Sequence, residues 1–246
     1  MDFHAFMYVT IGRRHELERG MAGKDPVLYQ RMLDEIAEYA RTCDQTGWAG
    51  IGIPEHHLQI EGFELGQDPG LMAMFLGDGA IREVGIAPRP LQNPIPVYSG
   101  FTHSLQTSPY WAKEAGKPIV MASEMGFCEM LWRRYREVAE EHGRQVTRGE
   151  EAAWGGYLVL ADTKSEAEAW AEDCLWMWDS WSVPFGQDRP PLLIGDADTV
   201  SRMIENAARH VPFREIFLLF GQGILDRDRC RKTLELCAEK VIPRFR

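Results

Sequence analysis

The chain has 246 residues, of which 45% are hydrophobic and 26% are charged, a composition typical of a soluble globular protein. This composition excludes an intrinsically disordered chain, a collagen and a small disulfide scaffold. With 27 Lys and Arg against 37 Asp and Glu, the formal net charge is −10. A negative chain repels phosphate backbones and anionic lipids, so nucleic acid and membrane surfaces are poor partners.

The sequence pattern indicates neither a membrane protein nor a secreted protein. No apolar run reaches the roughly 20 residues that a spanning helix needs, and residues 1–4 do not begin a signal peptide. We therefore expect a cytoplasmic protein. The cysteines are odd in number and lack C-x-x-C spacing, so we expect reduced, structural thiols and no metal site. They are Cys43, Cys128, Cys174, Cys230 and Cys237.

Strand and helix patterns alternate along the chain. Short apolar runs predict strands at 3–9, 48–54, 96–98, 118–122, 155–161 and 215–220. Apolar residues three and four apart predict helices at 26–46, 105–115, 127–142, 165–181, 199–210 and 226–241. This order predicts a single α/β domain with a parallel sheet, either a (β/α)₈ TIM barrel or an open doubly wound sheet.

The middle of the chain lacks what a full barrel requires. A barrel needs eight strands, and a chain of about 250 residues is the usual length. Residues 1–77 supply the first two β/α units and residues 78–246 the last four. Around 74–81 an apolar helix pattern ends and a polar loop begins with no strand between them.

Glu55, His56 and His57 directly follow the second predicted strand. In parallel α/β folds, functional sites form at the carboxyl ends of the strands. Histidine titrates near neutral pH and suits proton transfer, and a neighbouring carboxylate can orient its ring. The alternative is a pair of solvated loop histidines. A metal site is not indicated, because further ligands at suitable spacing are not found.

Three separated motifs resemble the bacterial luciferase-like flavin-dependent monooxygenases. The first is Glu55, His56 and His57 with Gly62 and Pro69. The others are 88–118 and the tail, comprising 194–200, 217–221 and 234–245. The resemblance covers nearly the whole chain and implies a luciferase-like TIM barrel that lacks strands 3 and 4.

Family members carry two further β/α units between the counterparts of Leu76 and Asp78, with a basic residue that grips the flavin phosphate. Either this segment is omitted from the sequence or it was deleted, as in the shortened flavin-binding relatives of luciferase. We expect an omission, with a chain break between Gly77 and Asp78, because an unclosed barrel exposes strand edges that proteins usually protect. Deletion stays open as the alternative.

The resemblance also implies catalytic roles. His56 matches the family's catalytic histidine, which assists proton transfer around the flavin hydroperoxide, and Glu55 and His57 would support it. Phe6, at the end of the first strand, matches an aromatic residue that lines the pocket. The alternative for Phe6 is ordinary packing in the barrel core.

Hydroxyl side chains follow the next strands. Thr102, Ser104 and Thr107 lie where a strand turns into a helix, and hydroxyls with free backbone N–H groups suit the phosphate of a flavin. The alternative is ordinary helix N-capping. Ser123, after the following strand, is a further candidate for flavin contact.

The implied reaction uses reduced FMN and O₂ to oxygenate a small aldehyde, ketone or similar substrate through a flavin peroxide. We expect reduced flavin to come from a separate reductase, because the chain has no nicotinamide fingerprint. A deazaflavin-dependent oxidoreductase of the same fold and a flavin-binding protein without turnover remain alternatives.

The apolar faces of two predicted helices lead to further expectations. Trp170, Cys174, Met177, Trp178 and Trp181 recur three and four apart, which indicates a buried or dimer-facing stripe rather than a ligand platform. The helix at 28–43 has an apolar face wider than packing on a sheet needs. With the helix at 71–75, it predicts the interface of a twofold homodimer, as the resemblance also implies.

Overall fold

The computed structural model describes residues 1–8, 10–54, 61–63, 97–99, 105–186, 189–221 and 224–246. Its parallel sheet has seven strands in the order β2-β1-β7-β5-β4-β3, and β6 pairs with β5 beside this path. The strands are β1 (Asp2–Met7), β2 (Gly50–Gly52), β3 (Tyr98–Ser99), β4 (Lys117–Val120), β5 (Ala153–Leu160), β6 (Leu192–Gly195) and β7 (Glu215–Phe220).

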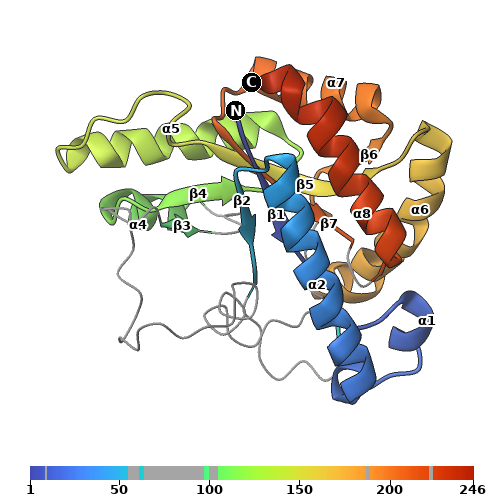
Figure 1. Ribbon diagram of the computed structural model, residues 1–246. Helices are drawn as coiled ribbons and strands as arrows, with labels where there is room; N and C mark the ends of the chain where they lie inside the picture. Colours follow the sequence, from blue (N-terminus) through green and yellow to red (C-terminus); the bar gives the residue numbers. More distant parts are fainter. Residues whose placement is uncertain (9, 55–60, 64–96, 100–104, 187–188, 222–223) are drawn as a thin grey trace, which may run out of the picture.

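The strand order is that of a partial (β/α)₈ barrel (Figure 1). The last strand, β7, returns to pair with the first, β1, as it does in a closed barrel. The strands β2 and β3 form the two ends of the order, where the two further barrel strands would stand. The partial barrel is therefore confirmed and the doubly wound alternative is wrong. The predicted break between Gly77 and Asp78 lies outside the described residues.

The helices follow the predicted pattern, with ends that shift by a few residues. They are α1 (Arg14–Leu17), α2 (Pro26–Thr46), α4 (Thr107–Lys113), α5 (Met125–Glu141), α6 (Lys164–Met177), α7 (Ala197–His210) and α8 (Arg227–Leu236). Local signals explain the ends of α2. The Asp25 carboxylate accepts hydrogen bonds from the N–H groups of Val27 and Leu28, and Gly47 ends the helix at φ +82°.

Two elements were not predicted, namely α1 and the strand β6. The strand pattern at 192–195 is short and follows Pro190 and Pro191, so it lacks the length of an ordinary strand signal. Among the described residues, β6 pairs with the second half of β5, from Tyr157 to Leu160. The pairing with β5, rather than a local sequence pattern, therefore makes residues 192–195 a strand.

Ring contacts identify the concave face of the sheet. Tyr98 in β3 and Phe217 in β7 have ring centroids 5.4 Å apart, although β4 and β5 separate these strands. Such a contact requires that the sheet curls and that both rings lie inside the curve. On the other face Phe220 packs edge-on against Tyr39 of α2, so the convex face carries helices.

The convex face holds most of the core. All five cysteine side chains are free and buried, as expected for structural thiols. Burial raises the pKa of the Cys43 thiol to about 12 and that of Cys128 to about 12, which keeps both thiols neutral. Trp170 and Trp178 are also buried, so the expectation of a buried stripe is confirmed for these two residues.

The apolar face of α2 is largely covered within the chain. Met32 and Ile36 are buried in the core, and Tyr29 and Leu33 pack against it at partial exposure. This chain therefore covers Met32 and Ile36 itself, so these two side chains do not require a second subunit. The helix expected at 71–75 lies outside the described residues, so the homodimer remains a proposal.

The loop between β1 and α2 is attached to α2 by ion pairs. Glu16 accepts from Arg31 at 2.6 Å and from the backbone N–H of Arg13 at 2.7 Å. Mainly through the hydrogen bond from Arg31, the pKa of Glu16 falls from 4.5 to about 2. An acid with a lowered pKa stabilises the fold above its unfolded pKa, and this stability is lost as the pH falls through the folded pKa.

We therefore expect the free energy of unfolding to fall between about pH 4.5 and 2 partly through Glu16. In Glu16→Gln this part of the decline should disappear. Urea unfolding of both proteins at a series of pH values measures it, with Glu18→Gln as a control on the same helix turn. Parallel pH curves for the parent protein and Glu16→Gln would contradict the assignment.

Candidate functional site

A row of side chains crosses the concave face near the carboxyl ends of the strands. The register aligns Phe6 of β1 with Gly52 of β2 and Leu219 of β7, and Leu219 with Tyr157 of β5. Aligned residues of parallel strands point to the same face. This row lies two residues beyond His4 and Phe217, whose row also faces inward. Phe6, Leu219 and Tyr157 therefore form an apolar band beside the strand ends.

Gly52 makes room for the ring of Phe6. A Cβ atom at Gly52 would lie 2.7 Å from Cδ2 of Phe6, closer than real contacts allow. The ring thus covers the backbone of β2, and its exposure is intermediate. Phe6 lies on the inward face, where the resemblance implies a pocket, and it also packs against the core. The position of Phe6 thus fits both a residue that lines a pocket and a residue that packs in the barrel core.

A polar cluster lies deeper, toward the amino ends of the strands. His4 stacks on Phe217 with ring centroids 4.6 Å apart, and Lys117 Nζ lies 3.0 Å from Glu215 Oε1. Burial lowers the pKa of His4, and burial together with Glu215 raises the pKa of Tyr98. Residues at this edge of a barrel usually serve stability, so we assign the cluster to holding the curled sheet.

Loops after three strands meet at the carboxyl edge. The N–H of Ile11, after β1, donates to the carbonyl of Gly62, after β2, at 3.0 Å. The guanidinium of Arg14 lies 4.9 Å from the ring centre of Trp176, which follows β5 on α6, and Phe63 lies 6.0 Å from the same ring. These contacts enclose one end of the carboxyl edge with aromatic side chains.

Trp178 lies next to this enclosure. Its ring is 5.6 Å from that of Tyr8, directly after β1, and 5.8 Å from that of Tyr157. The sequence pattern placed Trp178 only in a helix stripe, because its contacts with β1 and β5 have no local signal.

The predicted catalytic residues Glu55, His56 and His57 lie outside the described residues, as do Thr102 and Ser104. β2 ends at Gly52, and the roles of Glu55, His56 and His57, which come next in the sequence after Pro54, stay predictions.

Thr107 is the first residue of α4 and is exposed. Gln106 holds the N-cap position of α4, and both interpretations of Thr107 stay open. Its role in binding flavin stays a prediction.

Ser123 follows β4 at the same edge as Phe6 and is exposed. The next residue, Glu124, caps α5 and accepts hydrogen bonds from Gly126 N at 2.9 Å and Phe127 N at 2.6 Å. A carboxylate therefore already occupies the N–H groups that a phosphate would use, and its charge repels a phosphate. This position fits an uncharged part of a ligand better than a phosphate.

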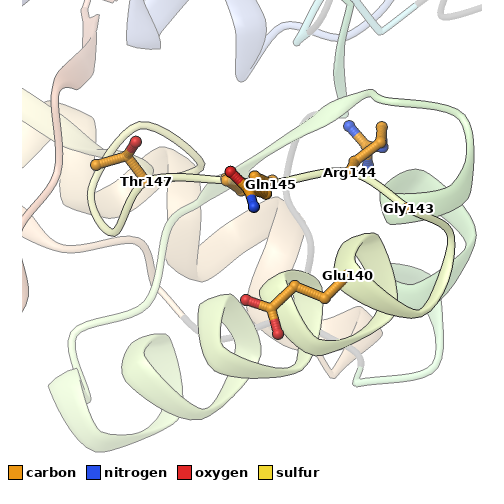
Figure 2. Close-up of a pocket in the computed structure, with 6 residues that line it drawn as sticks. Glu140, Gly143, Arg144, Gln145 and Thr147 are labelled. Carbon is orange, nitrogen blue, oxygen red and sulfur yellow. The ribbon is translucent and has the colours of Figure 1, made fainter.

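The surface also has an open polar hollow at the end of α5 (Figure 2). It is lined by Glu140, Gly143, Arg144, Gln145, Val146 and Thr147. The loop at 143–147 leads into the start of β5, at the edge opposite the carboxyl ends of the strands. The hollow is therefore separate from the candidate site.

Two further findings concern the described part of the chain. Within it, no group of three His, Cys, Asp or Glu side chains is arranged to hold a metal ion. None of its helices combines the length and the apolar character needed to cross a membrane.

Comparison with solved structures identifies the fold. The monooxygenase RslO1 from Streptomyces bottropensis matches with a TM-score of 0.75 and 14% identity, over 100% of both chains. Apo-MsnO8 matches at 0.64 and 11% identity, over 98% of each chain. Flavoprotein 390 matches at 0.59 and 12% identity, over 98% of this chain and 95% of its own. The chain has the fold of these three proteins.

This shared fold confirms the fold expected from the resemblance to luciferase-like proteins. No protein-family model and no curated protein matches the sequence. At identities of 11 to 14%, the structural likeness establishes the fold and leaves the activity to be inferred from the site.

Proposed function

We propose that the chain is a luciferase-like flavin-dependent monooxygenase that uses reduced FMN and O₂ to oxygenate a small aldehyde or ketone. One observation carries the proposal, namely the inward-facing apolar band near the carboxyl ends of the strands, the edge from which the chain continues after β2 into the sequence of Glu55, His56 and His57. Phe6 and Tyr157 belong to this band. The fold shared with a monooxygenase and a flavoprotein supports the same assignment.

The described residues fit the ring system of a flavin. A flat aromatic ring packs well against apolar and aromatic side chains. Phe6 is partly exposed on the inward face and would contact the ring, and the buried Leu219 and Tyr157 support Phe6 from the same row. For the phosphate, we propose the hydroxyls of Thr102, Ser104 and Thr107, because Glu124 makes the start of α5 unfavourable for an anion.

When bound, reduced flavin supplies two electrons and activates O₂. The protein's residues would orient the ring, exclude water and move protons. The apolar band would exclude water from the site. The imidazole of His56 would hold and transfer the proton, with Glu55 orienting its ring and His57 supporting it.

The partners follow from the same chemistry. We propose a separate reductase as the source of reduced flavin and a homodimer as the assembly. A deazaflavin would transfer hydride at the same band without O₂, so it is the second candidate cofactor.

Anaerobic titration with reduced FMN and with a reduced deazaflavin, followed by isothermal titration calorimetry, tests cofactor choice. We expect reduced FMN to bind, and more tightly than reduced riboflavin if the phosphate is recognised. Turnover is then measured with ¹⁸O₂ and a panel of aliphatic and aromatic aldehydes and ketones. Incorporation of one ¹⁸O atom into the product is the expected result.

Other outcomes separate the alternatives. Flavin binding with no product from any panel member would favour a binding protein without turnover. Hydride transfer that needs the deazaflavin and no O₂ would favour the oxidoreductase alternative. A purified protein that binds neither cofactor would contradict the proposal as a whole.

A further inference from the structure

The end of α6 changes its helical geometry at the carboxyl edge of the sheet. After Met177 the chain continues as a π-helical turn over Trp178–Ser182. π-helical turns are rare and occur frequently at functional sites, because the extra residue per turn changes the direction of the side chains. This turn begins with Trp178, which contacts Tyr8, directly after β1, and Tyr157 in β5.

Trp178 borders the apolar band described above. Its ring contacts Tyr8 at 5.6 Å and Tyr157 at 5.8 Å, the second in an edge-on arrangement. Tyr157 shares its row with Leu219 and Phe6. Trp178 therefore contacts a member of the band on which we place the flavin ring.

The indole N–H of Trp178 lacks a hydrogen-bond acceptor among the described residues. The side chain is well shielded, because the residue is only 5% exposed. A buried donor without an acceptor is unfavourable and calls for an explanation such as a ligand.

Two other buried indoles share this property but not the location. Trp132 lies in the middle of α5, and Trp48 lies before the first residue of β2, at the amino edge of the sheet. Of these three, Trp178 is the indole at the carboxyl edge. Trp132 and Trp48 therefore serve as matched controls.

We propose that Trp178 is a ligand-binding residue whose indole N–H donates a hydrogen bond to an acceptor atom of the bound ligand. This inference rests on the proposed function for the ligand's identity. The acceptor is a carbonyl oxygen, which both the flavin ring and an aldehyde or ketone substrate carry. The indole N–H of Trp178 would donate to a carbonyl of the flavin or to a carbonyl of the substrate, and separate titrations with the two ligands distinguish these cases.

Nuclear magnetic resonance of protein labelled with ¹⁵N-tryptophan tests the proposal without turnover. The indole N–H signal of Trp178 is assigned from Trp178→Phe and, independently, from Trp178→Tyr. Oxidised FMN is added first, and benzaldehyde is added in a separate sample. We expect the Trp178 signal to move downfield with one of these probes, and the signals of Trp132 and Trp48 to stay in place.

Affinity gives a second readout. Trp178→Phe keeps an apolar ring but removes the donor, and it should weaken binding of the same probe about 3- to 10-fold. Trp132→Phe, which removes an equally buried indole from α5, should bind as the parent protein does.

The outcomes are separable. If FMN binds, as its fluorescence shows, while neither probe moves the Trp178 signal, this inference is wrong and the proposed function stands. If the protein binds neither FMN nor benzaldehyde, both this inference and the proposed function are wrong. A shift with FMN assigns the acceptor to the flavin, and a shift with benzaldehyde alone assigns it to the substrate.

Discussion

His56→Ala is expected to lower the rate of oxygenation about 10²-fold or more while leaving flavin binding roughly unchanged. The resemblance places His56 at the family's catalytic histidine, directly after β2. Loss of a general acid or base typically costs 10² to 10⁴-fold, because the transition state then lacks its proton donor or acceptor. Steady-state rates with supplied reduced flavin, together with flavin titration, measure both parts of this expectation.

A surface histidine provides the matched control for His56. His142 follows α5, its Nδ1 lies 2.9 Å from the carbonyl oxygen of Val138, and it is far along the chain from the motif. His142→Ala should keep the parent rate. Added imidazole should restore part of the activity of His56→Ala, since it replaces the lost proton carrier. A rate within about threefold of the parent protein would remove His56 from the mechanism.

Glu35→Ala is expected to cost about 3 kcal/mol in the free energy of unfolding. Both carboxylate oxygens of Glu35 accept from Arg13, at 2.6 and 3.2 Å. The side chains are only 6% and 16% exposed, so removing Glu35 leaves a shielded guanidinium without its carboxylate. The pair also attaches the loop after β1 to α2, and this loop follows Tyr8.

An exposed ion pair nearby supplies the comparison for Glu35. Glu18 lies 3.0 Å from Arg14, but these side chains are 48% and 41% exposed. Glu18→Ala should cost less than about 1 kcal/mol, because water solvates both charges. The double replacement Arg13→Met with Glu35→Leu should cost less than Glu35→Ala, since no charge is then buried. Urea unfolding that gives equal costs for Glu35→Ala and Glu18→Ala would contradict the argument.

Local patterns in the amino-acid sequence were enough to predict the order of strands and helices and most of their ends. Asp25, Pro26 and Gly47 mark the ends of α2 through caps that act within a few residues. The apolar run at 215–220 marks β7 with its exact bounds. The sequence also places Glu55, His56 and His57 directly after the strand β2, because this prediction requires only that the end of a strand is recognised.

The tertiary structure alone decided how distant parts of the chain meet. It showed that Tyr98 reaches Phe217 across two intervening strands, that this chain covers Met32 and Ile36, and that Glu124 closes the start of α5 to a phosphate. It also brought Trp178 to Tyr8, 170 positions away by their residue numbers, at the edge of the site. Such contacts depend on the curl of the sheet and the packing of helices across it. A local pattern of residues carries no information about either.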